Sequence, residues 1–212
     1  MCMKIEQIQP AEIERRSFEI ITELLGDRQP PAETAHIVKR VIHTTADLEY
    51  ADTLYFSENA AQILSQALAE GAHVVTDTQM ALSGINKKAL ASFGGQVHCF
   101  MSDEDVARQA RERGVTRACV SMEKAASLAV PLIFAIGNAP TALLRLDELI
   151  REGAVSPRLV IGVPVGFVNV VSSKERIMTV GVPCIVARGR KGGSNVAAAI
   201  VNAGLYHLTR RE

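Results

Sequence analysis

A histidine and an arginine one helical turn apart are the residues of this chain best suited to chemistry. Arg40 and His43 lie three positions apart in a segment with helical periodicity, so their side chains share one face. His36 lies further back on a similar side. Histidine is the side chain whose unperturbed pKa is nearest neutrality, and a neighbouring cation attracts an acidic ligand. The pair predicts proton transfer to an acidic substrate, although a solvated polar face opposite Val38 and Ile42 would have the same spacing.

A second segment suited to anion binding is Arg188-Gly-Arg-Lys-Gly-Gly-Ser-Asn195, at the expected start of the last helix. It lacks the residue order of a P-loop and that of a G-x-G-x-x-G loop. Backbone amides at a helix N-terminus and arginine side chains both bind carboxylates and phosphates. We therefore expect an anion-binding loop here, with a tight solvated turn as the alternative.

Two other loops have less specific signals. Gly137 and Asn138 follow a wholly apolar segment, and Pro140 suits the first turn of a helix, so this loop either approaches a ligand or is a capping turn. We expect Arg117 in another loop, where it pairs with a ligand carboxylate or is an ordinary surface residue. No Ser-His-Asp or Cys-His arrangement can be recognised from the spacing.

Short runs rich in Val and Ile alternate with helical patterns along most of the chain. The strands that we expect are 73–76, 96–101, 132–136, 159–163 and 184–187. The helices that we expect are 10–25, one starting at about 32, 59–70, 103–113 with a capping-box-like start at Ser102, 141–152 and 194–208. This alternation predicts an α/β fold, a three-layer flavodoxin-like sandwich with a mainly parallel sheet of about five strands. Ligands then bind beyond the carboxyl ends of the strands, where we expect a large polar pocket.

Composition excludes several classes of protein. The 212 residues are 48% hydrophobic, which suits one domain over 1–212, and 23 basic residues balance 23 acidic ones, which argues against a nucleic-acid partner. No apolar run approaches the roughly 20 residues of a membrane helix, and no signal peptide is recognisable. The cysteines match no zinc module, and H-x6-H is not a common ligand spacing, so we expect no protein metal site. They are Cys2, Cys99, Cys119 and Cys184. We expect reduced thiols and a soluble, cytoplasmic protein with no membrane partner.

Six motifs, spread over about residues 8–208, together resemble the precorrin-8X methylmutase family of cobalamin biosynthesis. They are Glu14-Arg-Arg-Ser-Phe18, Arg40-Val-Ile-His-Thr-Thr-Ala-Asp47, Thr76-Asp-Thr-Gln-Met-Ala-Leu-Ser-Gly-Ile-Asn86, Gly137-Asn-Ala-Pro-Thr-Ala-Leu143, Gly162-Val-Pro-Val-Gly-Phe-Val168 and Gly189-Arg-Lys-Gly-Gly-Ser-Asn195. Each motif is weak alone, but their number and order make the resemblance specific.

The resemblance implies an enzyme that moves a methyl group from C11 to C12 of a tetrapyrrole ring and consumes no external cofactor. It implies a flavodoxin-like homodimer in which the N-terminal helices, at about 10–45, contribute to the active site. His43 matches the family's catalytic histidine, which donates a proton to the ring or hydrogen-bonds with it. Ser17, which the periodicity places on the apolar side of the first helix, and Arg40 match substrate-contacting residues, and Arg117 matches an arginine suited to a peripheral carboxylate. Further substrate-binding candidates within the motifs are Ser83, Gly84, Gly137 and Asn138.

Three of the motifs resemble the anaerobic branch of the family, whose substrate already holds cobalt. The metal would then belong to the substrate. One segment departs from the family pattern: Asn169-Val-Val-Ser-Ser-Lys-Glu175 stands where small residues, Gly-Ala-Ala, are expected before Ser-Lys-Glu. Asn and Val make this loop bulkier or more polar beside the substrate.

Two other functions compete with the isomerase. A non-catalytic corrinoid carrier could use the same pocket, but it has no need for His43 beside Arg40. A nucleotide-binding flavodoxin-like module should have a phosphate loop after its first strand, and Asp77-Thr-Gln-Met lacks the glycines for one.

Overall fold

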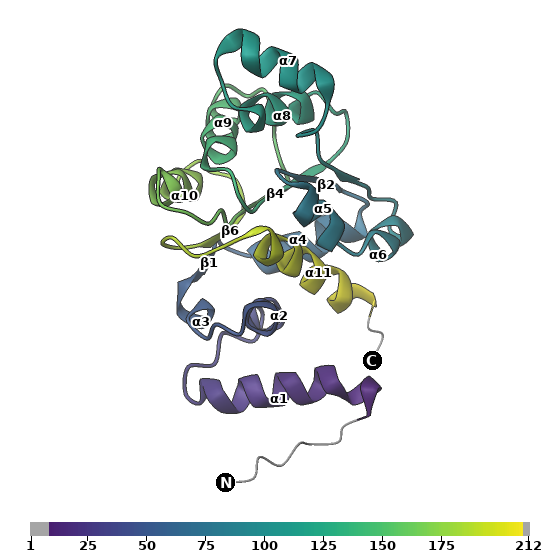
Figure 1. Ribbon diagram of the computed structural model, residues 1–212. Helices are drawn as coiled ribbons and strands as arrows, with labels where there is room; N and C mark the ends of the chain where they lie inside the picture. The colour runs from purple at the N-terminus through teal and green to yellow at the C-terminus, as the bar shows by residue number, and fades with distance from the viewer. Residues whose placement is uncertain (1–8, 210–212) are drawn as a thin grey trace.

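The computed structural model describes residues 9–209 and is built on a six-stranded mixed sheet (Figure 1). The strands are β1 (Leu54–Phe56), β2 (His73–Thr76), β3 (Val97–His98), β4 (Leu132–Ile136), β5 (Leu159–Gly162) and β6 (Cys184–Ala187). They lie side by side in the order β1-β6-β5-β4-β2-β3. Strands β2 to β6 are parallel, and β1 pairs antiparallel with β6. The prediction of about five strands missed β1, because three residues are too few to show a pattern.

The parallel part of the sheet follows from its buried aliphatic runs. Every residue of β4, β5 and β6 is buried, as expected for strands with helices on both faces. Numbered along the chain, the five parallel strands lie in the order 2-1-3-4-5, the order of flavodoxin-like sheets. The direction of winding reverses between β2 and β4. Such a switch point is where open α/β sheets usually bind their ligands.

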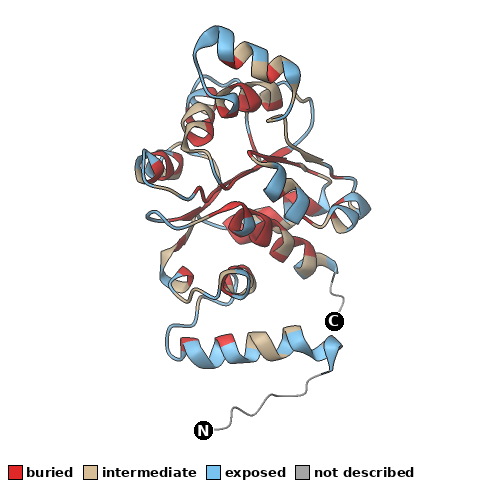
Figure 2. Ribbon diagram, in the orientation of Figure 1, coloured by how far each residue is buried: buried red, intermediate tan, exposed pale blue. Residues whose placement is uncertain are grey.

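Helices cover both faces of the sheet (Figure 1). On one face lie α8 (Arg117–Ala126), α9 (Pro140–Arg151) and α10 (Val170–Met178), with α7 (Glu104–Arg113) outside α8. On the other face lie α4 (Ala60–Ala69) and α11 (Ser194–Thr209), with α5 (Gln79–Gly84) and α6 (Lys87–Ser92) beside α11. Figure 2 shows buried segments in the sheet, in α4 and α11 on one face, and in α8 and α9 on the other, so the core lies along both faces of the sheet.

The N-terminal helices form a further layer outside α11. Helix α2 (Ala35–Thr45) packs on α11, and α1 (Ile13–Leu25) packs on the far side of α2 (Figure 1). The short η1 (Pro10–Glu12) precedes α1, and α3 (Tyr50–Thr53) leads into β1. Only Ile21 and Leu25 of α1 are buried, so most of this helix faces solvent (Figure 2).

Several predicted elements are confirmed and others need correction. The strands predicted at 73–76, 132–136 and 184–187 have these bounds in the structure. The strand predicted at 96–101 is reduced to β3, because the chain leaves the sheet edge after His98. The helices missed are α3, α5, α6, α8 and α10. No helix within residues 9–209 is both long enough and apolar enough to cross a bilayer.

The predicted capping box before α7 is wrong. The N-cap is Asp103, not Ser102, and it makes no side-chain capping hydrogen bond. Its carboxylate binds Lys124 Nζ instead, at 2.7 Å, and Asp105 binds the same ammonium at 2.8 Å. An ion pair with the neighbouring helix α8 thus replaces the local cap.

Candidate active site

His43 lies in the last turn of α2 with its side chain exposed. Its imidazole contacts the ring of Phe18 from α1, with ring centroids 5.4 Å apart and planes tilted by 47°. Aromatic packing therefore supports the imidazole on one side, and the other side is open to a ligand.

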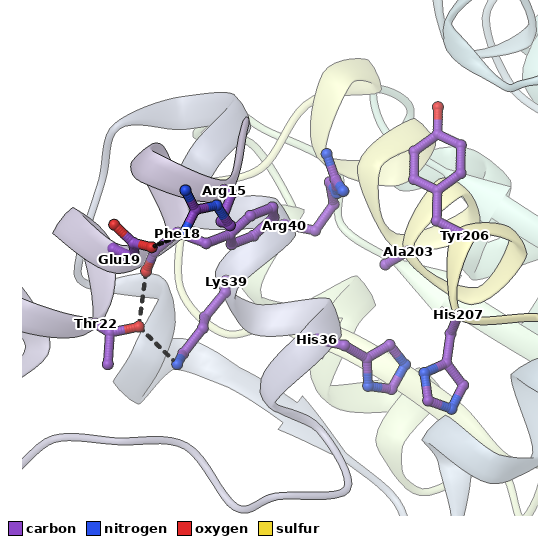
Figure 3. Close-up of a pocket in the computed structure, with 10 residues that line it drawn as sticks. All are labelled: Arg15, Phe18, Glu19, Thr22, His36, Lys39, Arg40, Ala203, Tyr206 and His207. Carbon is purple, nitrogen blue, oxygen red and sulfur yellow. Dashed lines mark hydrogen bonds and ion pairs between the residues drawn. The ribbon is translucent and has the colours of Figure 1, made fainter. Parts of the chain in front are cut away.

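The guanidinium of Arg40 is enclosed between three helices. Its side chain is 12% exposed and pairs with the carboxylate of Glu14. Its Cζ lies 4.9 Å from the centre of the Phe18 ring and 5.0 Å from that of Tyr206 (Figure 3). Such cation–π contacts and the ion pair join α1, α2 and α11. In this conformation Arg40 holds α1 against the helix that carries His43.

A groove of about 660 Å³ lies between α1, α2 and α11 (Figure 3). Its lining combines cations, aromatic rings and two histidines: Arg15, Phe18, Glu19, Thr22, His36, Lys39, Arg40, Ala203, Tyr206 and His207. The groove lies between helices outside the sheet, whereas the sequence predicts a pocket along the sheet edge. Because Phe18 both lines the groove and contacts His43, the groove ends beside the catalytic candidate.

His36, which shares a face of α2 with Arg40, stacks on His207 of α11. The ring centroids are 4.4 Å apart and the planes differ by 23°. Burial, together with the neighbouring His207, lowers the pKa of His36 to about 4. Its Nε2 atom is buried without a hydrogen-bond partner. His36 is therefore neutral at neutral pH and serves the contact between the two helices.

Ser17 lies on α1 beside Phe18 and is half-buried. The apolar side on which the sequence places it is not a core face, because Ile13, Ile20 and Leu24 are exposed. Its hydroxyl donates a hydrogen bond of 2.8 Å to the carbonyl of Ile13 in the same helix. The lone pairs of the hydroxyl oxygen remain available to a ligand donor.

A carboxylate of the chain itself occupies the switch point of the sheet. Asp77, directly after β2, is fully buried. It accepts hydrogen bonds from the backbone N–H groups of Gly137 at 2.9 Å, Asn138 at 2.8 Å and Ala139 at 2.6 Å. Burial raises the pKa of Asp77, and these three bonds oppose the rise. These amides precede α9, the position at which a nucleotide-binding sheet would hold phosphate. Because the Asp77 carboxylate already accepts from them, the position is closed to an anionic ligand.

Two glycine candidates are packing positions. A Cβ atom on Gly137 would lie 2.6 Å from the Cα of Ser194, and one on Gly84 would lie 3.0 Å from the Cβ of Ala198. Both glycines therefore allow close approach of α11 or of the loop before it. Close packing is enough to explain why both positions are glycine, without a bound ligand.

Ser83, Asn138 and Arg117 are exposed. Arg117 is the first residue of α8 and not a loop residue, because Thr116 caps this helix by accepting a hydrogen bond from Cys119. Helix α8 covers one face of the sheet, and the helix of His43 lies on the opposite side, outside α11 (Figure 1). Thr116 donates a hydrogen bond of 3.0 Å to Thr141 at the start of α9. Arg117 therefore lies near the carboxyl edge, but in a different layer from His43.

The predicted anion-binding loop lies between β6 and α11 and exposes Arg188 and Arg190. Lys191 in the same loop binds Asp47 at 2.6 Å and Glu49 at 2.8 Å. Hydrogen bonding to Lys191 lowers the pKa of Asp47. Since both carboxylates follow α2, these ion pairs tie the loop to the end of the helix that carries the catalytic candidate.

The atypical segment after β5 has a simple backbone explanation. Asn169, at the start of α10, has φ 57° and ψ 8°, the left-handed conformation that glycine adopts freely. Asparagine is among the few other residues that tolerate it. The loop before it leaves Phe167 and Val168 exposed to 84% and 78% at the carboxyl edge of the sheet.

No group of three or more His, Cys, Asp or Glu residues within 9–209 is arranged to hold a metal ion. Cys99, Cys119 and Cys184 are free thiols, and Cys2 lies outside the described residues.

Sequence reasoning missed the roles of three residues. Asp77 could have been found as an acid directly after a buried strand, at the expected ligand edge. Glu14 and Phe18 lie within the first family motif, one turn apart and facing the same side as Ser17, which was singled out. Only the tertiary packing shows that they contact Arg40.

A family model described as precorrin-8X methylmutase matches residues 12–207. The cobalt-precorrin-8 methylmutase of Salmonella typhimurium is 48% identical over 206 residues, covering 94% of this chain and 96% of that protein. That of Priestia megaterium is 47% identical over 196 residues, covering 92% of this chain and 87% of the relative. The crystal structure of a precorrin-8X methylmutase from Thermus thermophilus superposes with a TM-score of 0.84 at 37% identity, covering 92% of this chain and 96% of that one.

The chain belongs to the precorrin-8X methylmutase family. The predicted family is thus confirmed over nearly the whole length described. The protein is an isomerase of cobalamin biosynthesis, a methylmutase that moves a methyl group from C11 to C12 of the precorrin-8 ring.

Proposed function

We propose that this chain acts on cobalt-precorrin-8 with His43 as its acid. The observation that carries this proposal is the place of His43: an exposed imidazole at the end of α2, packed against Phe18, in a chain of this family. The names of the two relatives described above support the cobalt-containing substrate. Cobalt is then part of the substrate, and the reaction uses no external cofactor.

The methyl shift is intramolecular, so no group enters or leaves the substrate. The protein's part is to hold the ring in one geometry and to stabilise the charge that develops as the methyl group moves. His43 would donate a proton to, or hydrogen-bond with, the ring at that point. Ser17, on the neighbouring helix α1, would contact the substrate near this group.

The periphery of the substrate carries acetate and propionate groups, and its faces are apolar. The carboxyl edge has cations and apolar side chains that match both. Arg188 and Arg190 are exposed in the loop before α11, and Phe167 and Val168 in the loop after β5. Arg117, at the start of α8, would meet a carboxylate of a macrocycle that lies across the edge and spans the two helix layers.

The other predicted site residues would contribute in three different ways. Ser83 and Asn138 are exposed and would contact the substrate directly. Gly84 and Gly137 would shape the site through the backbone, since each fits against a neighbouring segment. Arg40 would reach a substrate carboxylate only by leaving Glu14, so its first role is to position α1.

We infer further that the chain is a flavodoxin-like three-layer sandwich forming one domain, with the helices at about 10–45 as part of its active site, and that two copies associate in the cytoplasm. The strand order 2-1-3-4-5 supports the fold class. The exposed Ile13, Ile20 and Leu24 of α1, which the substrate assignment does not use, support a partner surface. Light scattering in solution tests the dimer, and a monomer at micromolar concentration would contradict it.

The deciding experiment mixes the purified protein with precorrin-8, with and without cobalt, and follows the visible spectrum. The wild type should yield the corrin spectrum, faster with the cobalt form. His43→Ala should lower kcat by a factor of about 10²–10⁴, the usual contribution of a general acid. Because His43 is exposed, the variant should fold normally. Full activity of this variant would remove His43 from the chemistry, and binding without conversion by the wild type would indicate a corrinoid carrier.

A further inference from the structure

Lys174 is a buried cation that the catalytic assignment does not use. It lies on α10 and is only 1% exposed, among the largest fully buried side chains. Within residues 9–209 no carboxylate lies within ion-pair distance of its ammonium group. Burial lowers the pKa of Lys174 to about 8. A buried ammonium group costs stability that a methionine of similar length would not, so packing alone does not account for a lysine here.

Within the described part of the chain, the Lys174 side chain hydrogen-bonds to one loop only. Its Nζ donates to the carbonyl of Gly189 at 2.9 Å and to that of Lys191 at 2.8 Å. Helix α10 itself is fixed by other residues: Ile177 is buried in the apolar layer, and Arg176 pairs with the buried Asp147 of α9. The ammonium group of Lys174 therefore acts on the shape of the loop between β6 and α11.

This loop connects the two sides of the proposed substrate site. On one side the N–H of Gly166 donates to the Arg190 carbonyl at 3.1 Å, next to the exposed apolar residues after β5. On the other side Lys191 binds Asp47 and Glu49, which follow the helix of His43. Gly192 packs so closely that a Cβ atom would lie 2.1 Å from the Val163 carbonyl oxygen.

We infer that Lys174 is a positioning residue for substrate binding: by holding the carbonyls of Gly189 and Lys191, it fixes a loop that presents Arg188 and Arg190 to the carboxylates of the substrate. This inference rests on the proposed function, since it assigns those arginines to the substrate. The two loop carbonyls point inward to Lys174 while Arg190, between them in sequence, is exposed. Lys174 also adds a positive charge at this edge, which favours an anionic ligand.

The test compares Lys174→Met with Arg176→Met in the full chain. Both variants remove a cation from α10, but the second breaks only the contact between α10 and α9. Lys174→Met should raise KM for cobalt-precorrin-8 about tenfold, with kcat within about threefold of the wild type. Hydrogen exchange of the backbone amides of 188–193 should become faster in this variant. Arg176→Met should lower the melting temperature and leave both KM and exchange of this loop unchanged.

Lys174→Met with unchanged KM and unchanged loop exchange would overturn the inference, whatever its melting temperature. Faster loop exchange with unchanged KM would also overturn it, because the loop would then be held without effect on the substrate. If the wild type converts no precorrin-8, the proposed function fails. In that case loop exchange still decides whether Lys174 holds the loop, and the affinity for cobyrinate, followed by absorption, decides whether the loop binds a corrinoid.

Discussion

The switch point of the sheet buries an ionisable side chain, whereas the end of α2 exposes one to solvent. At the switch point, Asp77 is fully buried and its carboxylate accepts three backbone hydrogen bonds. At the end of α2, His43 is exposed and its ring packs against that of Phe18. Open α/β sheets commonly bind ligands at the switch point, but here the carboxylate of Asp77 fills that position. The accessible acid–base group, His43, lies in a helix layer outside the sheet.

This difference shows how one fold changes its function without changing its sheet. The loop before α9 provides three N–H groups, which need acceptors wherever they are shielded from water. A nucleotide-binding relative of this fold would satisfy them with phosphate, and here a carboxylate from β2 does so. The groups that remain available to a large anionic ligand are then those of the loops and of the N-terminal helices.

The largest change in stability should come from breaking the closed site. Asp77→Ala leaves one buried and two partly buried N–H groups without an acceptor and should lower the free energy of unfolding by about 3 kcal/mol. Urea denaturation measures this loss. Asp105→Ala, which removes one of two carboxylates from Lys124 at an exposed site, is the control and should leave the urea midpoint nearly unchanged. Formate should recover part of the loss in the Asp77 variant only, and equal stability of the two variants would contradict the buried-anion role.

A smaller effect is expected where Arg40 joins three helices. Arg40→Lys keeps the charge and the pairing with Glu14 but loses the planar group that lies near two aromatic rings. We expect a loss of about 1–2 kcal/mol in unfolding free energy. Denaturant unfolding of Arg15→Lys, an exposed position on α1, gives the matched comparison and should change by less than about 0.5 kcal/mol. An unchanged free energy of unfolding in Arg40→Lys would mean that the arginine is not what holds α1.

The smallest effect concerns pH and the stacked histidines. The pKa of His36 is about 4 in the folded chain against 6.5 when unfolded. As the pH falls, His36 is protonated in the unfolded state before it is protonated in the folded state. Its contribution to the free energy of unfolding is therefore complete above pH 6.5 and is lost as the pH falls toward 4. Allowing for partial exposure, the loss between pH 7.5 and 5 should be about 1 kcal/mol. His36→Phe keeps a ring against His207 and should lose correspondingly less over the same range. Identical pH profiles for the two proteins would exclude this contribution.

Much of the fold could be predicted because most strands are buried apolar segments and several helices are followed by glycine. Strands β4 and β6 are short, fully buried apolar runs, and β2 has Val74 and Val75 at its centre. Gly71, Gly114 and Gly153 follow the ends of helices α4, α7 and α9. Elements without such marks were missed. Strand β1 is short, and α8 begins at a threonine cap that resembles an ordinary polar loop.

The sequence by itself determined the family, the α/β alternation and the chemical candidates Arg40 and His43, because these depend on local periodicity and on ordered motifs. The tertiary structure alone decided which groups are free to act. It paired Arg40 with Glu14, placed Asp77 under the amides of α9 and buried Lys174 beneath a loop. The physical reason is that pairing and burial join residues far apart in the chain, and the free energy of a charge depends on those partners more than on its sequence neighbours.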